Sequence, residues 1–311
     1  MKRAVITGAT GMLAVATANR LLAEGYEVVC VARPSSSRLS NIPQDDKVTV
    51  VELDMARITE LPQVLKASGI EGADLFFHFA WDGTHGDSRN DMDIQIVNIK
   101  SAVEAVRTAA ALGCSAFLGA GSQAEYGRVP DGTALTPDLP CRPENGYGMA
   151  KFCAGQMTRV EAEKLKIKHV WVRILSTYGP YDGAHTMVMS AVAGMAEGKV
   201  IPFTKGEQMW DYLYSADAAE AFYLAATKGK PSAVYTIGSG RVMQLADYIR
   251  EIRDIVAPGL ELGIGQREYY PGQVMYLAAD ITNLTEDTGF VPKYTFSEGI
   301  KETYEWYRKQ M

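Results

Sequence analysis

Three side chains in the middle of the chain have the types and spacing that proton transfer beside a reacting oxygen requires. Tyr147 and Lys151 are four residues apart, so they would lie on one face of a helix, and Ser122 precedes Tyr147 by 25 residues. A phenol ionises at about pH 10, and a neighbouring ammonium group stabilises its phenolate. A serine hydroxyl can orient the reacting oxygen by a hydrogen bond. Together these residues predict oxidation of an alcohol or reduction of a carbonyl.

A glycine-rich turn near the N-terminus is the second group with a chemical use. Gly8, Gly11 and Ala14 stand between an apolar run and a helical pattern. Glycine lets the backbone approach a pyrophosphate, and the helix N-terminus offers N–H donors and the positive end of its dipole. The third position needs only a small side chain for close packing of helix and strand. The turn therefore predicts a dinucleotide site.

The elements that would position these residues follow from an alternation of apolar runs and helical patterns in the first half of the chain. Continuous runs of Val, Ile and Phe are typical of parallel strands buried on both faces. The expected strands are Ala4–Thr7, Glu27–Ala32, Thr49–Leu53, Asp74–Phe79, Ala116–Gly119 and His169–Ile174. The expected helices are Gly11–Glu24, Asp91–Leu112, Tyr147–Leu165, Ser215–Thr227 and Phe296–Lys309. The predicted fold class is α/β, with a doubly wound parallel sheet.

After about residue 175 glycine and proline interrupt the pattern, at Tyr178–Gly183, Val200–Phe203 and Tyr269–Gly272. We expect a smaller, discontinuous α/β substrate lobe there. The predicted dinucleotide-binding domain comprises residues 1–175 and about 212–229, and the substrate-binding lobe comprises about 176–211 and 230–311.

Composition bounds the possible partners. The 311 residues are 47% apolar and 22% charged, which is ordinary for a soluble globular enzyme. A net charge of −6 argues against a nucleic-acid or membrane partner. The four cysteines show no CxxC pair and are expected to be small buried thiols, and no metal-ligand spacing is present. Met1-Lys2-Arg3 leads directly into an apolar strand without a readable secretory signal or membrane span, which predicts a cytoplasmic protein.

In this order, the two motifs resemble the short-chain dehydrogenase/reductase superfamily, and specifically its extended branch of nucleotide-sugar epimerases, dehydratases and ketoreductases. The stretch Leu118–Gly127 also resembles the S-x-x-x-Y-G signature of that branch. The resemblance implies a Rossmann-type domain with Ser122, Tyr147 and Lys151 as catalytic residues. It also implies a homodimer through the helices Asp91–Leu112 and Tyr147–Leu165.

The same resemblance implies a set of cofactor contacts. They are the turn residues Gly8, Thr10, Gly11 and Met12, then Asp54 and Met55 at the adenine, Phe79, Ala80 and Trp81 along the cofactor, Asn98 on the next helix, and Tyr147 with Lys151. For Asn98 a structural role is an equal alternative.

The end of the second expected strand bears on the choice of cofactor. NAD enzymes place an acid there to hold the ribose 2′-hydroxyl. The stretch Val31–Arg38 has no acid but contains Arg33, Arg38 and three serines, which could hold a 2′-phosphate by charge-assisted bonds. This favours NADP(H), with NAD as the alternative. The other interpretation of this stretch is a polar loop that is exposed to solvent and binds no phosphate.

Two departures from the family pattern narrow the reaction and the substrate. Nucleotide-sugar 4,6-dehydratases carry an Asp-Glu pair where this chain has Gln123 and Ala124, which argues against dehydration; Glu125 is displaced by one residue and is expected to face away from the sugar. Ser176 and Trp210 replace an asparagine and an arginine that contact substrate phosphates in the family, and an arginine before Pro271 is also missing. The candidate substrate contacts are Trp81, Gln123, Ser176, His185, Trp210 and Tyr270, and Arg267, Arg241 and Lys205 are possible replacement cations.

These observations predict an NAD(P)-dependent oxidoreductase that acts on a small-molecule substrate, a nucleotide-activated sugar, by 4-keto reduction or 4-hydroxyl oxidation. The alternative is a nucleotide-sugar 4-epimerase that retains NAD. A third possibility is a non-catalytic cofactor-sensing or scaffold protein on the same fold, against which the complete triad argues.

Overall fold

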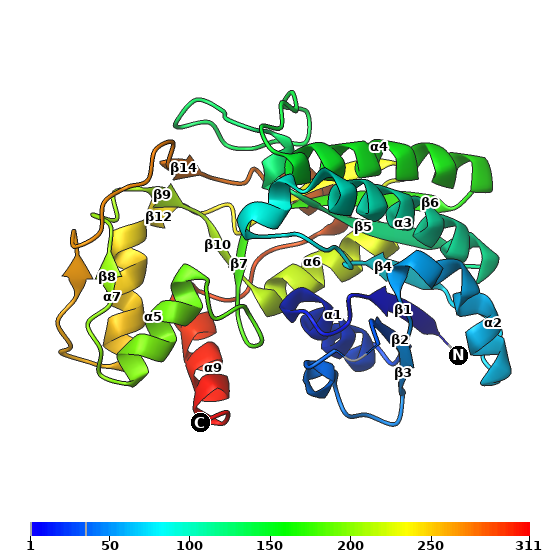
Figure 1. The fold of residues 1–311 in the computed structure, drawn as a ribbon, viewed down its shortest axis with the longest axis horizontal. Coiled ribbons are helices and arrows are strands. Elements are labelled where there is room, and N and C mark those ends of the chain that lie inside the picture. Colours follow the sequence, from blue (N-terminus) through cyan, green and yellow to red (C-terminus); the bar gives the residue numbers. More distant parts are fainter. Residues whose placement is uncertain (1, 35) are drawn as a thin grey trace.

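A seven-stranded parallel sheet forms the centre of the computed structural model, which describes residues 2–34 and 36–311 (Figure 1). Met1 and Ser35, one of the three serines expected at the 2′-phosphate, lie outside the described residues. The strand order is β11-β6-β5-β4-β1-β2-β3. The strands are β1 Arg3–Thr7, β2 Glu27–Ala32, β3 Val48–Glu52, β4 Leu75–His78, β5 Ala116–Ser122, β6 Lys168–Ile174 and β11 Ala233–Ile237.

Helices cover both faces of this sheet because alternate strand residues point to opposite sides. Ile6 and Val28 belong to the core beneath one layer, whereas Val5 and Val29 belong to the core beneath the other. The first layer contains α1 Met12–Ala23, α6 Ser215–Lys228 and α8 Thr282–Thr288. The second contains α2 Leu61–Ala67, α3 Met92–Ala111 and α4 Gly146–Leu165.

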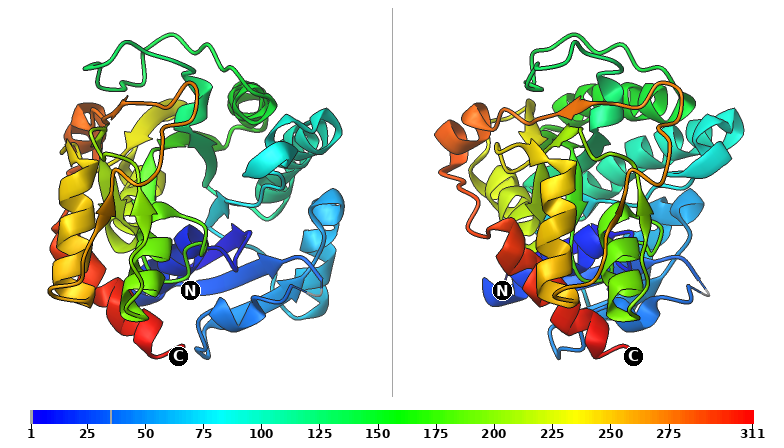
Figure 2. Two further views of the ribbon diagram at one scale, coloured as in Figure 1. Left: turned by 60° about the vertical axis from the view of Figure 1, so that its left-hand side comes forward. Right: turned by 90° about the vertical axis from the view of Figure 1, so that its left-hand side faces the viewer.

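Most of the remaining elements form a separate apolar cluster on the left of Figure 1, and Figure 2 shows the same group from two other sides. Its helices are α5 Met187–Ala196, α7 Leu245–Val256 and α9 Phe296–Arg308. Its short strands are β7 Ser176–Tyr178, β8 Pro202–Phe203, β10 Tyr212–Tyr214 and β13 Gly263–Ile264. The strands β9 Met209–Trp210, β12 Met243–Gln244 and β14 Tyr276–Leu277 form a three-stranded sheet, whose Trp210 and Leu277 belong to another apolar cluster. Val192, Ile249 and Ile300 are fully buried where the three helices meet.

The predicted α/β class and doubly wound parallel sheet are confirmed, and the six expected strands and five expected helices are all present. Strand β5 continues to Ser122, three residues beyond its expected end. The boundary expected at residue 230 is wrong for one segment, since Ala233–Ile237 pairs with β6 in the main sheet. The place of this five-residue segment in the sheet depends on its pairing with β6, which lies about 60 residues earlier in the sequence. The division into two domains otherwise stays a prediction.

All four cysteines are free thiols: Cys30 and Cys114 are buried, and Cys141 and Cys153 are half-buried. Within residues 2–34 and 36–311, no helix combines the length and apolarity that crossing a membrane would require.

Candidate active site

The glycine turn leaves the start of α1 open to a cavity. Gly8 has a φ of +68°, and a Cβ at this position would lie 2.7 Å from the Ala80 nitrogen, so only glycine fits. The Gly11 nitrogen donates to the Gly8 carbonyl at 3.1 Å, and Gly11 is the N-cap of α1. The backbone can therefore approach a bound anionic group closely at the positive end of the helix dipole.

One cavity of about 330 Å³ brings the glycine turn and the predicted catalytic residues together. Ser122 ends β5, and Tyr147 and Lys151 lie in the first turns of α4, which is capped by the Asn145 side chain. The full lining is Gly8, Gly11, Met12, Leu13, Ala14, Phe79, Trp81, Thr84, Ala120, Gly121, Ser122, Tyr147, Lys151, Ile174 and Leu175. Residues 140 positions apart in the sequence thus face one space.

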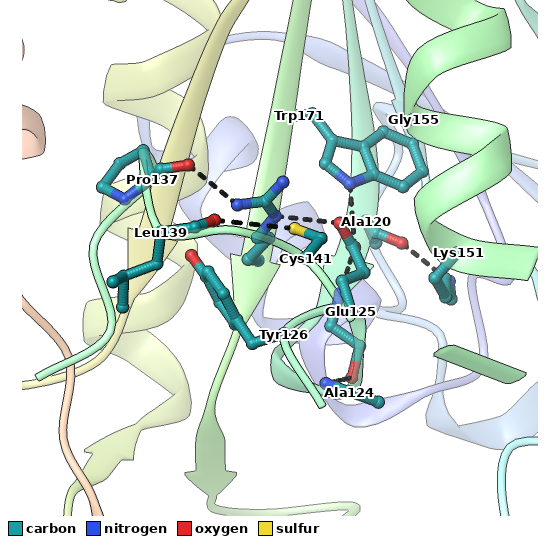
Figure 3. Close-up of polar contacts among 12 residues, drawn as sticks. Ala120, Ala124, Glu125, Tyr126, Pro137, Leu139, Cys141, Lys151, Gly155 and Trp171 are labelled. Carbon is teal, nitrogen blue, oxygen red and sulfur yellow. Dashed lines mark hydrogen bonds and ion pairs between the residues drawn. The ribbon is translucent and has the colours of Figure 1, made fainter. Parts of the chain in front are cut away.

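Lys151 is buried beside aromatic rings, and no carboxylate of the described residues forms an ion pair with it. Its Nζ donates to the Ala120 carbonyl at 2.6 Å, as drawn in Figure 3, and lies 3.7 Å from the centre of the Trp81 ring. Burial lowers the pKa of Lys151 to about 7, an effect that the Glu125 charge only partly opposes. The ammonium group can therefore gain or lose a proton near neutral pH.

Tyr147 is surrounded by groups that oppose each other in their effect on its ionisation. Burial raises the pKa of Tyr147 above the usual value of a phenol, and the Ser122 hydroxyl and the charge of Arg89 offset this only in part. The Arg89 guanidinium lies 4.4 Å from the centre of the Tyr147 ring, and the Trp81 ring meets it edge-on at 6.3 Å.

Glu125 does not line this cavity. Its side chain contacts neighbouring residues instead, as Figure 3 shows. Its carboxylate is 1% exposed and accepts hydrogen bonds from the Ser122 nitrogen at 2.9 Å and from Trp171 Nε1 at 3.0 Å. It also forms an ion pair with Arg173 at 2.9 Å. That Glu125 faces away from a bound sugar stays a prediction, and the local structure differs from the strand geometry on which the prediction was based. Glu125 closes a capping box on the 3₁₀ helix η4, Gln123–Glu125, instead of alternating along a strand.

A second cavity, of about 230 Å³, adjoins the first through Gly8, Gly11, Phe79 and Trp81. Its other lining residues are Thr10, Val31, Ala32, Arg33, Arg38, Met55, Ala80 and Asp82. Both arginines expected at the 2′-phosphate face this space, and Arg33 Nη1 lies 3.2 Å from a carboxylate oxygen of Asp82.

Two residues expected at the cofactor line neither cavity, and their side chains are used locally. The Asp54 carboxylate accepts from the Ala56 nitrogen at 2.8 Å and caps the 3₁₀ helix η2, Met55–Glu60. The Asn98 side chain donates to the Asp82 carbonyl at 2.8 Å and accepts from the Asp82 nitrogen at 3.1 Å. The contacts of the Asn98 side chain therefore agree with the alternative that Asn98 has a structural role.

Four of the six candidate substrate residues line two further cavities, whereas Trp81 lines both cavities already described. A cavity of about 420 Å³ is lined by His185, Trp210 and Tyr270 together with Met187, Pro202, Phe203, Thr204, Gln208, Tyr212, Leu245, Ile249, Arg267, Glu268 and Gln273. Ser176 is absent from this lining, and its hydroxyl accepts a hydrogen bond from Trp210 Nε1 at 2.7 Å. Gln123 lines a smaller cavity of about 220 Å³, which shares Gln273 with the larger one. Of the three possible replacement cations, Arg267 faces the larger cavity.

Sequence reasoning missed Arg89 and Gln208. Arg89 lies in the 3₁₀ helix η3, Gly86–Asn90, a segment without periodicity or motif that could have marked it. Gln208 is 3% exposed, and its Oε1 accepts no hydrogen bond from the described residues. Among residues 2–34 and 36–311, no cluster of three or more His, Cys, Asp or Glu side chains is arranged to hold a metal ion.

The model of the NAD-dependent epimerase/dehydratase family matches residues 4–238. The chain belongs to this family. The match confirms the resemblance that the glycine turn and the triad indicated, and it covers all seven strands of the main sheet.

Curated relatives include dTDP-glucose 4,6-dehydratases. That of Escherichia coli K12 is 27% identical over 198 residues, which cover 58% of this chain and 55% of the relative. That of Streptomyces niveus is 26% identical over 252 residues, which cover 77% and 71%. The chain spans about half the length of the first of the curated relatives that it matches.

Solved structures show the same fold at low identity. A UDP-glucose 4-epimerase from Thermotoga maritima, in a structure with UDP-glucose, has a TM-score of 0.85 at 22% identity and covers 99% of both chains. A UDP-N-acetylglucosamine 4-epimerase from Methanobrevibacter ruminantium has a TM-score of 0.88 at 21% identity, covering 100% of this chain and 99% of the other. A dTDP-glucose 4,6-dehydratase from Bacillus anthracis in complex with NAD has a TM-score of 0.82 at 20% identity, covering 99% and 97%.

Proposed function

We propose that this protein is an NAD(P)-dependent oxidoreductase that transfers a hydride at one carbinol or keto carbon, C4, of a nucleotide-activated sugar. The observation that carries the proposal is the single 330 Å³ cavity onto which the glycine turn and Ser122, Tyr147 and Lys151 all open. A reacting carbon placed there lies beside both a dinucleotide turn and a proton-transfer group.

Each residue of the triad has a task that its contacts support. The Ser122 hydroxyl, which lines the same cavity as Tyr147, orients the sugar oxygen. Tyr147 takes the proton from that oxygen in alcohol oxidation and returns it in carbonyl reduction. Lys151, one turn further along α4, stabilises the phenolate when protonated. A bound nicotinamide accepts or supplies the hydride.

For the cofactor, we propose NADP(H), with NAD as the alternative. The glycine turn fits a dinucleotide, because a side chain at Gly8 would collide with the backbone at Ala80. Support for a 2′-phosphate comes from Arg33 and Arg38, which both line the 230 Å³ cavity at the end of β2. The solved relatives named with NAD leave the alternative open for this chain.

The substrate side supports a ligand that extends beyond the sugar. The 420 Å³ cavity offers aromatic rings at Phe203, Trp210 and Tyr270, which suit a stacked base, and a cation at Arg267, which suits a phosphate. The nucleotide-sugar names of the relatives agree with a substrate of this class.

A homodimer is part of the proposal. Met92, Ile96 and Val97 on α3 and Met149, Met157 and Val160 on α4 are apolar and 44% to 61% exposed. The two helices lie side by side on the outer face of the sheet, where Arg107 and Glu161 join them at 2.7 Å (Figure 1). An apolar patch of this kind is typical of a protein interface.

The nucleotide that co-purifies with the protein tests this proposal against its nearest competitor. Mass spectrometry of a denatured sample would identify any released dinucleotide. A separate native sample would be assayed with NADPH and keto-sugar nucleotides. An empty or exchangeable site with consumption of NADPH supports the reductase. Tightly held NAD with interconversion of C4 epimers identifies an epimerase, and absence of any turnover with a bound nucleotide would indicate a sensor.

A further inference from the structure

Two cations lie near Tyr147: Lys151 and Arg89. The Arg89 guanidinium lies over the phenol ring, 4.4 Å from its centre, whereas Lys151 Nζ lies 5.7 Å from the same point. Arg89 comes from η3, a segment that follows β4, so this charge reaches the tyrosine from outside its own helix. Attraction between a guanidinium and an aromatic face is favourable at such a distance.

The position of Arg89 is set by several contacts at the start of α4. Its Nη1 donates to the Thr84 carbonyl at 3.1 Å, and the neighbouring Asn90 side chain accepts from the Gly146 nitrogen at 2.9 Å. A Cβ on Gly146 would lie 2.9 Å from the Arg89 carbonyl oxygen, so η3 and the first residue of α4 are in close backbone contact. The charge is therefore held immediately next to Tyr147.

The two cations differ in how constant their charge is. Lys151 lies between the Trp81 ring and the Ala120 carbonyl, and burial lowers its pKa to about 7. Near neutral pH, only part of the Lys151 population carries a charge. A guanidinium keeps its charge throughout this range.

The other polar groups near the tyrosine do not replace this charge. From η4, the Glu125 carboxylate acts against the phenolate, and it is already paired with Arg173. From β5, Ser122 contributes only a hydroxyl. Behind Lys151, His78 on β4 is neutral, because burial lowers its pKa to about 3.

We propose that Arg89 is a positioning residue whose fixed positive charge over the ring favours the phenolate form of Tyr147 whatever the protonation state of Lys151. This inference rests on the proposed role of Tyr147 in proton transfer. Beyond that role, the inference assigns to Arg89, in the segment after β4, a positive charge that favours the phenolate.

The test is the pH profile of kcat/KM for alcohol oxidation, in which the acidic limb reports loss of the Tyr147 proton. Arg89→Gln removes the charge and should move that limb to higher pH by about one unit. Arg89→Lys keeps a charge and should restore the limb to within a few tenths of a unit. The matched control is Arg57→Gln, which breaks an exposed ion pair with Glu60 and should not move the limb.

Two results would overturn the inference, and they are distinguishable from failure of the proposed function. A lower rate at every pH with an unmoved limb in Arg89→Gln would show only structural support by Arg89. A limb that moves equally in Arg89→Lys and Arg89→Gln would exclude charge as the cause. If Arg89→Gln does not fold, Arg89→Met serves as the uncharged variant. Full turnover in Tyr147→Phe would instead refute the role of Tyr147, and the inference with it.

Discussion

Glu125 and Lys151 are both buried beside the candidate active site, but their charges are compensated differently. Glu125 has an ion pair and two further hydrogen bonds, whereas Lys151 has one carbonyl oxygen and the face of Trp81. Buried ionised groups are stable when they are paired and hydrogen-bonded. Glu125 therefore contributes to a rigid framework at the end of β5, whereas burial disfavours the charged form of Lys151.

The stability of the protein should reveal this difference. Burial lowers the pKa of Lys151 from 10.5 to about 7, so between these values the unfolded chain binds more protons than the folded one. Stability therefore rises with pH across this window, and the cost of burying the charge is complete below pH 7. We expect Lys151→Met to raise the free energy of unfolding by a few kcal/mol at pH 7, with the gain shrinking toward pH 10.

Urea unfolding of both proteins at pH 7 and pH 9 measures this. Lys164→Met, on the exposed end of the same helix, is the control and should leave the free energy of unfolding nearly unchanged. A Lys151→Met protein that is less stable than the unmodified one at pH 7 would show that the buried ammonium group does not destabilise the folded state.

Arg33 and Arg38 allow the cofactor proposal to be tested by substitution. The double variant Arg33→Ala, Arg38→Ala removes both charges from the 230 Å³ cavity and leaves Asp82 there. Each charge-assisted bond contributes about 1.5–3 kcal/mol, which is about one to two decades in affinity. NADP(H) binding should therefore weaken far more than NAD(H) binding, as measured by titration calorimetry. The control is Arg57→Ala, an exposed arginine paired with Glu60; equal losses for both cofactors would contradict the assignment.

Sequence spacing predicted the triad and the glycine turn because both depend on local geometry: Tyr147 and Lys151 share a helix face, and Gly8 needs a positive φ. Residues whose roles arise from contacts between distant segments were not predictable in this way. Arg89 reaches Tyr147 only because Asn90 docks on α4. Ser176 and Trp210 were each recognised as unusual, but their hydrogen bond required the structure.

At the level of elements, the apolar runs before residue 175 and the long helical patterns were recognised, whereas β11 and the strands of two or three residues were not. The five-residue strand β11 joins the main sheet through its pairing with β6. This is a tertiary contact, which the local sequence pattern does not predict. The short strands of the smaller cluster have two or three residues each, too few for a period to be read.

The exposed apolar residues of the helices α3 and α4 allow the proposed homodimer to be tested. Ile96 is 61% exposed and Met157 is 48% exposed on their outer faces. The variant Ile96→Glu, Met157→Glu should convert a dimer into a monomer with an unchanged circular dichroism spectrum, because two charges would have to be buried at the interface. Light scattering gives the mass. The control is Val291→Glu, which is 59% exposed elsewhere; a double variant that remains dimeric would place the interface on another surface.

For the molecule as a whole, the arrangement supports hydride transfer without loss of water, although the curated relatives include dTDP-glucose 4,6-dehydratases. Gln123 and Ala124 have no carboxyl group, and the Glu125 carboxylate is fully engaged by Ser122, Trp171 and Arg173. We expect incubation with common nucleotide-hexoses to yield no product lighter by one water in a mass spectrum. Efficient formation of a 4-keto-6-deoxy sugar would show that another pair of residues performs the acid–base chemistry.

The central claim is that Tyr147 serves hydride transfer at a sugar carbon, and transfer of an isotope label tests it most directly. With NADPH deuterated at the reactive nicotinamide position and a 4-keto sugar nucleotide, the account predicts one deuterium at C4 of the product. Tyr147→Phe should bind cofactor normally but slow the transfer by about 10²–10⁴-fold. Tyr294→Phe, an exposed tyrosine that does not line the cavity, is the control and should react at the normal rate. Undiminished transfer in a folded Tyr147→Phe protein, or a product without deuterium at C4, would contradict the account.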